Sequence, residues 1–250
     1  MDRGAYLLEV IRKYTQYFFG QSNEKIPDFE LYIVHNHLLS ERKRFLLNAF
    51  NPKTRAHFIE IENQAPQLSA SFYDGVRPSN WLLKCEGLWY EAPEPRQLSR
   101  AEIACTASHF YTYQRFLKES DKEWLLVLED DAIFKSGLEK AIQDKLRIFP
   151  LWADALFIGG GFSHHLISRT LGKYKNFLIK HHPATNTTVA YMLRRRLVEK
   201  IAEKFEKFDL PIDYELAHLL MINNAVVLHC DPYLISEGSK FAYQSSIRGR

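Results

Sequence analysis

The sequence predicts an α/β fold in which a mostly parallel central sheet is flanked by helices. Residues 124–128, WLLVL, form a continuous apolar run of strand length, and residues 154–158, DALFI, form a second one. Between them, residues 136–149 place apolar side chains at helical spacing. Strands that are apolar throughout and alternate with helices are typical of a parallel sheet covered on both faces. Helices are therefore expected on both sides of the sheet.

The other elements follow from local signals along the chain. Residues 4–18 place apolar side chains on one helical face, and Gly20 follows as a stop signal. The remaining predicted strands are 31–35, 57–61, 187–192 and 225–229. The remaining predicted helices are 40–50, capped by Ser40; 100–118, capped by Ser99; 194–208, with a solvated start at Arg194-Arg195-Arg196; and one that opens at 211–213.

The domain organisation follows from where these signals weaken. Residues 63–98 are rich in Pro, Gly and Ser with weak periodicity, which predicts a long loop or lid. Residues 1–28 are expected to form an N-terminal amphipathic helix and its connector. Residues 29–250 are expected to form one domain, because nothing within them marks a boundary.

Composition excludes several classes of protein. The 250 residues include 33 Lys and Arg against 30 Asp and Glu, and this net charge of +3 is too small to indicate a nucleic-acid partner. The three cysteines lie far apart and fit neither a zinc knuckle nor a disulfide framework, so a cytoplasmic location is expected. No apolar run approaches the ~20 residues that a membrane-spanning helix needs.

An acidic cluster, Glu129-Asp130-Asp131, directly follows the apolar strand at 124–128. Ligands of open α/β sheets bind at the carboxyl ends of the strands, where these carboxylates are expected. Two like charges ~4 Å apart repel by about 4 kcal/mol at an effective dielectric of about 20, and a bound cation offsets that repulsion. Oxygen ligands without cysteine favour Mg²⁺ or Mn²⁺. The alternative is a solvated turn.

Phosphate-binding loops of the known kinds are missing from the sequence. Gly159-Gly160-Gly161 follows a predicted strand but lacks the residues of a P-loop and the spacing of a dinucleotide fingerprint. We interpret it as a turn or as a close backbone approach to a sugar. An acidic cluster beside a long loop suits nucleotide-sugar chemistry, in which a metal neutralises a diphosphate leaving group.

Five blocks of sequence occur in a diagnostic order. They are LSRAEIACTASH at 98–109, LVLEDDA at 126–132, DALFIG at 154–159, Ala190-Tyr191-Met192 followed by Pro211-Ile212-Asp213, and Ser245-Ser246-Ile247. In these blocks the chain resembles glycosyltransferase family 25, the lipooligosaccharide galactosyltransferases and their relatives. The chain departs from the family pattern in four places: only Val34 and Asn36 of its "vINL" strand end are kept, its "vdG" has no clear counterpart after Ile61, Glu237 replaces a common glutamine, and the N-terminal thirty residues lie outside the pattern.

The resemblance implies a single GT-A type (Rossmann-like) domain and a metal-dependent inverting glycosyltransferase that uses Mn²⁺ or Mg²⁺. It implies a UDP-sugar donor, with galactose from UDP-galactose as the hexose, and a bacterial lipooligosaccharide, lipid-linked glycan or other surface glycan as acceptor. Another UDP-hexose donor and nucleotide-sugar hydrolysis are alternatives. A catalytically silent glycan-binding module of the same fold is an alternative of another class, against which the intact acidic triplet argues.

The resemblance also assigns site residues. Asp131 is the direct metal ligand, and Glu129 and Asp130 contact ribose, donor sugar or metal-bound water. The other implied donor-binding residues are Asn36 and Arg42 at the first strand's end, with Glu102, Ser108 and His109. A buried core histidine is the alternative for His109, and an acid that complements the helix N-terminus is the alternative for Glu102.

The base and a second metal ligand are less closely defined. Asp213 is the candidate general base, with Glu215 and Asp231 as alternatives. An aspartate that caps the helix would have a lowered pKa, which weakens a base. His229, which ends the last predicted strand, is a candidate second metal ligand because a late histidine has this role in some transferases of the fold. A histidine that is simply hydrogen-bonded at a strand end is the favoured alternative.

The first helix raises the question of membrane contact. Its aromatic side chains, together with Arg3, Arg12 and Lys13, would suit peripheral contact with an anionic membrane at the cytoplasmic face of the inner membrane. Packing of this helix on its own domain is the favoured alternative.

Overall fold

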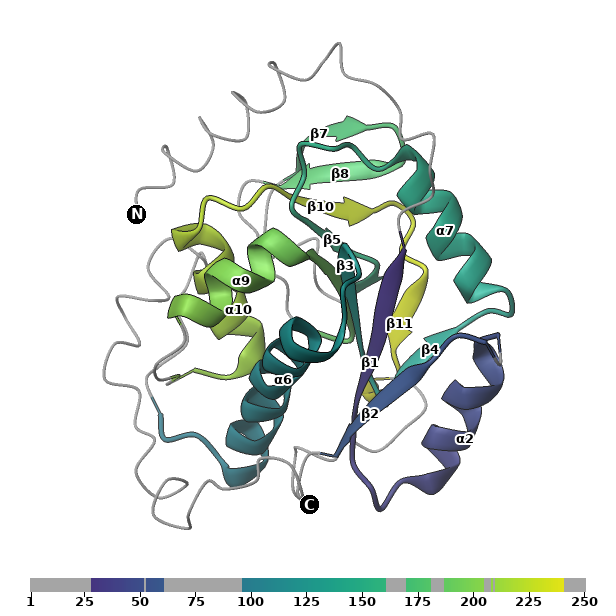
Figure 1. Ribbon diagram of the computed structural model, residues 1–250, viewed down its shortest axis with the longest axis vertical. Coiled ribbons are helices and arrows are strands. Elements are labelled where there is room, and N and C mark those ends of the chain that lie inside the picture. Colours follow the sequence, from purple (N-terminus) through teal and green to yellow (C-terminus); the bar gives the residue numbers. More distant parts are fainter. Residues whose placement is uncertain are drawn as a thin grey trace.

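The computed structural model describes residues 28–51, 53–60, 96–160, 170–180, 187–204, 208 and 210–240. The predicted helix at 4–18 and most of the predicted loop at 63–98 lie outside these residues, as does Gly161. Figure 1 shows a central sheet with helices on both sides.

The central sheet has eight strands in the order β2-β1-β3-β9-β5-β10-β8-β7. Their bounds are β1 Phe29–His35, β2 Ala56–Glu60, β3 Trp124–Glu129, β5 Ala155–Phe157, β7 Thr170–Tyr174, β8 Phe177–Lys180, β9 Ala190–Arg194 and β10 Val227–Cys230. Strands β2, β1, β3, β5, β10 and β7 run in one direction, and β9 and β8 run against them. The predicted α/β class, with a central sheet whose strands mostly run in one direction between helices, is confirmed; the division at residue 28 stays a prediction.

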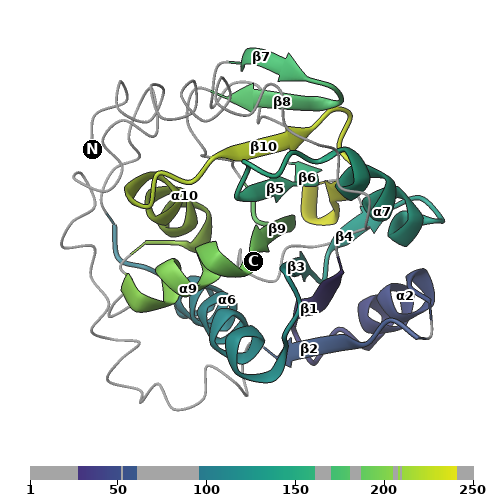
Figure 2. The ribbon, with the colours of Figure 1, turned by 45° about the horizontal axis from the view of Figure 1, so that its top comes forward.

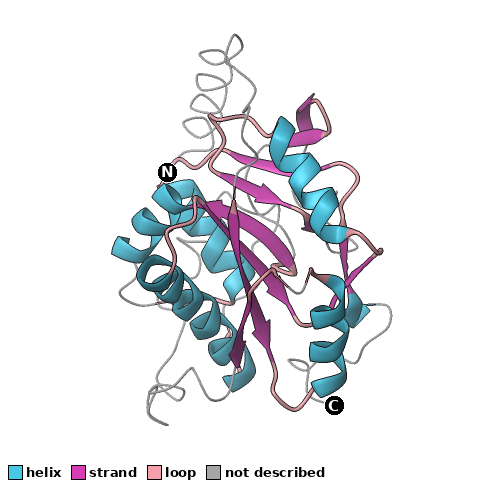
Figure 3. Cartoon of the chain, turned by 45° about the vertical axis from the view of Figure 1, so that its right-hand side comes forward, coloured by secondary structure: helices cyan, strands magenta, loops and turns pink. Residues whose placement is uncertain are grey.

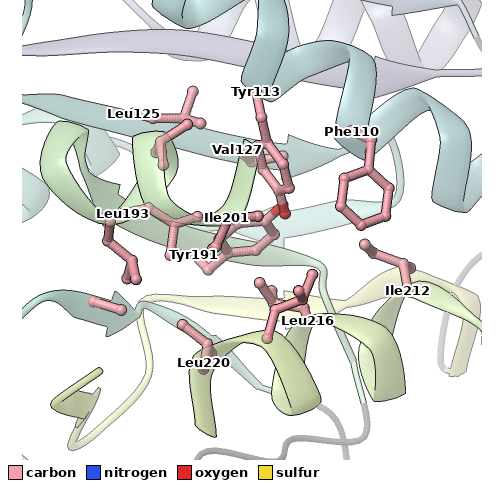
Figure 4. Close-up of a cluster of buried hydrophobic side chains, with 14 of the residues drawn as sticks. Phe110, Tyr113, Leu125, Val127, Tyr191, Leu193, Ile201, Ile212, Leu216 and Leu220 are labelled. Carbon is pink, nitrogen blue, oxygen red and sulfur yellow. The ribbon is translucent and has the colours of Figure 1, made fainter. Parts of the chain in front are cut away.

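Helices form a layer on each face of the sheet (Figure 3). One layer contains α6 (Arg100–Glu119), α9 (Arg195–Lys204) and α10 (Ile212–Ile222), and the other contains α2 (Ser40–Ala49) and α7 (Leu138–Ile148). Strand β3 serves both layers, because its successive side chains alternate between the faces. Leu125 and Val127 pack in the core with α6, α9 and α10 (Figure 4), whereas Leu126 and Leu128 pack in the core with α2 and α7.

The two predicted helix caps have different outcomes. Ser99 caps α6 in a capping box: its hydroxyl accepts from the Glu102 amide, and the Glu102 carboxylate accepts from the Ser99 amide at 2.9 Å. The cap at Ser40 is wrong, because α2 begins at Ser40 itself and its N-cap, Leu39, makes no side-chain cap bond. Only Ser99 has an acidic residue three positions later to complete the box.

The predicted solvated helix start at residues 194–196 is wrong for Arg194, whereas Arg196 is exposed as predicted. Arg194 is buried, with its guanidinium 4.6 Å from the centre of the Trp124 ring and Nη1 2.6 Å from Glu123 Oε1. Arg196 donates to Asp154 Oδ1 at 2.6 Å. These ion pairs connect the residues before β3 and β5 to the end of β9. The sequence shows three consecutive arginines but not these distant partners.

A second, small sheet was not predicted from the sequence. It has the order β4-β11-β6, with β4 Ala132–Phe134, β6 Gly159–Gly160 and β11 Ile235–Glu237, followed by a short 3-10 helix at Gly238–Lys240. Figure 2 shows β4 and β6 beside the ends of β3 and β5. Antiparallel pairing of β11 with β4 sets Glu237 opposite Ala132, directly after the acidic triplet.

Close packing explains the first two glycines of the 159–161 run, which was predicted as a turn or a sugar contact. A β-carbon at Gly160 would lie 2.3 Å from the Tyr233 ring, and one at Gly159 would lie 2.7 Å from Val189. Both glycines lie in strand β6, so the turn prediction is wrong for them.

Candidate active site

The acidic triplet lies at the carboxyl end of β3, where the main sheet meets the small sheet. Glu129 is the last residue of β3, and Asp130 and Asp131 form the turn into β4. Segments far away in the sequence reach this turn, from the end of β1, from the residues before β9 and from β11. The three carboxylates therefore have different partners.

Asp130 is fully engaged with the end of β1 and with α2. Its Oδ2 accepts from the Asn36 amide at 2.8 Å and lies 3.1 Å from His35 Nδ1, and its Oδ1 accepts from Arg42 Nη1 at 2.7 Å. Burial alone would raise the pKa of Asp130, but these three bonds outweigh burial and hold the pKa below its ordinary value. Asp130 is thus a stable anion that joins β1, α2 and β3.

Asp131 is less well compensated. Its Oδ2 accepts from the Ser239 amide at 3.0 Å, whereas its Oδ1 is buried without a hydrogen-bond partner among the described residues. Burial, and then the negative charge of Glu129, raise the pKa of Asp131 to about 7; Glu237 adds to this rise. The Glu237 side chain shares Ser239 with Asp131, since Glu237 Oε1 accepts from the Ser239 hydroxyl at 2.9 Å.

These residues fit a hard divalent cation. The unpartnered Oδ1 of Asp131 is a buried oxygen ligand, and the carboxylates of Glu129 and Glu237 add negative charge around it. Mg²⁺ and Mn²⁺ prefer carboxylate oxygens and take the rest of their ligands from water or phosphate. Asp131 is thus the described residue best suited to hold such an ion.

Glu129 contacts two buried side chains from other elements. The hydroxyl of Thr188 donates to its Oε1 at 2.5 Å, and Nε2 of His109 lies 3.4 Å from the same oxygen. His109, on α6, is fully buried, and its Nδ1 lies 2.7 Å from the Tyr191 hydroxyl. His109 is therefore a buried core histidine, as the alternative interpretation expected, and it is separated from the exposed part of the acidic cluster by the Glu129 side chain.

Within the described part of the chain, one trio of metal-binding side chains brings its ligand atoms within 4.8 Å of one another: Cys105, His109 and Glu129. Thiol, imidazole and carboxylate together would suit zinc rather than Mg²⁺ or Mn²⁺. Burial, followed by the charges of Glu129 and Asp213, raises the pKa of the Cys105 thiol well above its ordinary value. The thiol is therefore held protonated, and Asp131 remains the better oxygen ligand for a hard cation.

Asp213 lies at the start of α10, close enough to the triplet for the charges to interact. Burial raises its pKa to about 7 and the charge of Glu129 adds to the rise, against a hydrogen bond from the Tyr214 amide at 3.1 Å. The expectation that Asp213 caps the helix is wrong, because the N-cap is Pro211. The objection that a cap lowers its pKa therefore no longer applies.

Two of the implied donor-binding residues on α6 have local structural partners. Glu102 belongs to the capping box and also accepts from Arg96 Nη1 at 2.8 Å, so the structure supports the alternative of an acid at the helix N-terminus. Ser108 is buried, and its hydroxyl donates to the Ala104 carbonyl of the same helix at 2.8 Å.

The remaining candidates lie at the ends of β10 and α10. His229 is buried, stacks on Phe157 with ring centres 5.2 Å apart, and has Nδ1 3.2 Å from the Tyr233 hydroxyl. Asp231 pairs with Lys173 at 2.5 Å, and Glu215 is buried in the first turn of α10. Metal ligation by His229 stays a prediction, as do the roles of the other site residues.

Among the residues that sequence reasoning missed are His35, Thr188, Ser239 and Tyr191, which touch the triplet or its partners. Tyr191 lies in a recognised sequence block, so the block itself was the available signal. Thr188 and Ser239 lie 59 and 108 positions from their carboxylate partners, and no local spacing connects them.

A comparison with protein-family models finds a match to glycosyltransferase family 25 (LPS biosynthesis protein) over residues 40–216. This range contains all the predicted site residues except Asn36 and His229. A search of curated proteins finds no match. Within the described residues, no helix has the length and apolar character needed to cross a membrane.

Similar solved structures include mouse xyloside xylosyltransferase 1 in its apo form, with 12% identity and a TM-score of 0.36 over 88% of this chain and 79% of that one. The inositol-1-phosphate CTP transferase from T. maritima has 10% identity and a TM-score of 0.39 over 93% and 74%. A197 from STIV has 11% identity and a TM-score of 0.37 over 83% of both chains. These likenesses are too distant to carry substrates or residue roles to this chain.

Proposed function

The chain belongs to glycosyltransferase family 25, and we propose that it is a metal-dependent inverting transferase. The proposed donor is UDP-galactose, and the proposed acceptor is a lipooligosaccharide or another surface glycan. Family membership supports the reaction class, and the chemistry of the site supports the need for a metal.

One observation carries the metal requirement: Asp131 has a buried oxygen without a hydrogen-bond partner among the described residues, beside two further carboxylates. Asp131 would hold Mn²⁺ or Mg²⁺, with Glu129 and Glu237 supplying additional negative charge. When bound, the ion would neutralise the charge that develops on a diphosphate leaving group. Asp130 would act differently, by holding Arg42 and the Asn36 backbone at the nucleotide side of the site.

Asp213 is the proposed general base. Burial raises its pKa to about 7, so near neutral pH its carboxylate accepts a proton more strongly than that of an ordinary aspartate. In an inverting reaction the acceptor hydroxyl attacks the anomeric carbon once, and Asp213 takes the hydroxyl proton as the bond to the diphosphate breaks. Its position at the amino end of α10 places it near Glu129 and Glu102, whose charges both raise its pKa.

A thermal-shift panel of nucleotide sugars with and without Mn²⁺ tests the donor and the metal together. We expect UDP-galactose to stabilise the protein only when Mn²⁺ is present, because Asp131 would hold the ion that neutralises the diphosphate. A stabilisation independent of metal would contradict the metal requirement. Stabilisation by another UDP-hexose alone would replace the proposed donor.

Turnover assays with Asp213→Asn test the base. The variant should lose transfer by about 10²–10⁴-fold, the usual contribution of a general base, while UDP and Mn²⁺ still bind. Asp144→Asn, on the exposed face of α7, is the control and should transfer at the wild-type rate. Hydrolysis of the donor without any acceptor would indicate a nucleotide-sugar hydrolase. Donor binding without turnover would indicate a glycan-binding module.

For location, we propose a cytoplasmic enzyme that meets its lipid-linked acceptor at the inner membrane. Flotation of the full chain with anionic liposomes, compared with neutral phosphatidylcholine liposomes, tests peripheral contact. Flotation with the anionic liposomes alone would support peripheral contact, and flotation with neither lipid would contradict it.

A further inference from the structure

A line of buried polar side chains leads from the middle of the core to the acidic cluster. The hydroxyls of Tyr113 and Tyr191 lie 2.7 Å apart, Tyr191 lies 2.7 Å from His109 Nδ1, and His109 Nε2 lies 3.4 Å from Glu129 Oε1. Figure 4 shows Tyr113 and Tyr191 pointing toward one another from α6 and β9. The three ring residues are completely buried, so they are enclosed by protein on every side.

The order of donors in this line follows from its end at Glu129. A lone pair on Nε2 would face the carboxylate oxygen unfavourably, so Nε2 carries the proton and Nδ1 is the acceptor. Tyr191 then donates to Nδ1, and Tyr113 donates to Tyr191. Burial raises the pKa of both tyrosines, so both hydroxyls keep the protons that this order requires.

Complete burial separates His109 from any donor sugar. A side chain without exposed surface does not contact a ligand in this conformation, whereas Glu129 retains 21% of its side-chain surface exposed. The Thr188 hydroxyl donates to the same oxygen of Glu129. His109 can therefore influence the site through the position of Glu129.

We infer that Tyr113, Tyr191 and His109 are positioning residues that fix the carboxylate of Glu129 for donor binding. This inference rests on the proposed transferase function, because Glu129 is the group through which the line acts. At 3.4 Å from Glu129 Oε1, His109 Nε2 makes no hydrogen bond among the described residues, and we expect this separation to shorten when donor binding moves Glu129.

A double-mutant cycle tests the inference. Tyr191→Phe keeps the ring but removes the donor to His109, and we expect it to lower kcat/KM for the donor about tenfold. In a Glu129→Gln background the same change should cost less than about twofold, because the group that it positions has lost its charge. The affinity for UDP with Mn²⁺, measured calorimetrically, provides the same cycle if turnover of the Gln variant is too slow. Equal losses in both backgrounds would overturn the inference.

Tyr32→Phe is the matched control. Tyr32 is a fully buried tyrosine of the same core cluster, and its hydroxyl has no hydrogen-bond partner among the described residues. Its replacement should leave kcat/KM unchanged. Tyr113→Phe should have a smaller effect than Tyr191→Phe, because the bond to His109 survives. Thermal unfolding of each variant shows which remain folded.

The tautomer of His109 gives a second readout that does not depend on turnover. Long-range ¹H–¹⁵N correlation spectra should show the proton on Nε2 in the wild type, and a proton on Nδ1 would overturn the inferred order. If the wild type shows neither donor binding nor turnover, the proposed function fails. If it shows both and the cycle is additive, only the positioning role fails.

Discussion

The two ends of strands β3 and β5 hold their charges in opposite ways. At the amino end, Glu123 meets Arg194 and Asp154 meets Arg196, while Asp154 Oδ2 also accepts from the Val226 amide at 2.9 Å. At the carboxyl end, one carboxylate of the triplet, Asp130, has an arginine partner, and the others are held by hydroxyl and amide donors.

The difference supports the proposed ligand site at the carboxyl end. Guanidinium groups neutralise the amino end from within the protein, so removing one of them leaves an imbalance there. Hydroxyls and amides stabilise a carboxylate without cancelling its charge, and the pKa values of Asp131 and Asp213 are both raised to about 7. The uncompensated carboxylates therefore lower the stability of the fold at the carboxyl end, and a bound cation would offset this loss.

The largest expected effect comes from removing the charge of the proposed metal ligand. Asp131→Asn should lower donor turnover by about 10³-fold, equivalent to about 4 kcal/mol of transition-state stabilisation, and abolish stabilisation by Mn²⁺. Without metal, the variant should melt at a higher temperature than the wild type, because the amide at position 131 is not repelled by the charge of Glu129. Turnover and differential scanning fluorimetry measure both effects. A lower melting temperature in the metal-free variant would remove the contrast between the two ends.

At the amino end, removing a charge should lower stability instead of raising it. Arg194→Met should lower the free energy of unfolding by about 3 kcal/mol, because it removes a buried guanidinium that binds Glu123 and the Ala153 carbonyl. Urea unfolding measures this loss. Arg147→Met, in an exposed pair with Asp144, is the control and should change stability by less than about 1 kcal/mol. Equal losses in the two variants would contradict the structural role of Arg194.

The pH dependence of stability sharpens the comparison further. Asp213 has a pKa of about 7 when folded and an ordinary value of 3.8, so between these pH values the folded state holds a proton that the unfolded state has released. Stability must therefore fall as pH rises through this window, with the loss complete above about pH 7. Asp131 contributes in the same direction.

Thermal unfolding of the metal-free protein between pH 4.5 and pH 8 tests this slope. Asp213→Asn should flatten it and raise the melting temperature at pH 8 by several degrees relative to wild type. Asp144→Asn is the control and should follow the wild-type curve. An unchanged slope in Asp213→Asn would show that the carboxylate ionises with an ordinary pKa.

A smaller effect is expected at Glu237. Glu237→Gln keeps an acceptor for the Ser239 hydroxyl but removes a charge near Asp131, so Mn²⁺ affinity should fall about tenfold. Glu139→Gln is the matched control. Glu139, on α7, also accepts from a hydroxyl at 2.9 Å, that of Thr54, but it lies in the other helix layer from α6. Calorimetric titration with Mn²⁺ measures both variants. Equal affinities in wild type and Glu237→Gln would exclude a role for that charge.

The parts of the fold predicted from sequence are those with strong local patterns. The apolar run of β3 and the Ser99 cap of α6 each lie within a few consecutive residues, and both predictions are confirmed. The strands of the small sheet have two or three residues, too few to show a period. The partners of Arg194 lie 41 and 71 positions away, so its burial has no local signal.

The candidate site likewise has parts that local sequence patterns predict and parts that depend on distant residues. The position of Glu129-Asp130-Asp131 followed from the strand before it, whereas the bond from Arg42 to Asp130 comes from the fold. The different states of the three acids depend on donors from distant segments, such as Ser239 for Asp131. The sequence shows which residues can ionise, whereas the fold determines what ionisation costs.

The contact between Gly160 and Tyr233 has a consequence for how this fold changes in evolution. The tyrosine ring occupies the space that a β-carbon would need at position 160, at a separation of 2.3 Å. Mutation at either position alone would leave a clash or a void, so relatives should change both together. Larger residues at 160 should then be found with residues smaller than tyrosine at 233. An alignment of the family would reveal this pair as covarying positions that join β6 to the segment before β11.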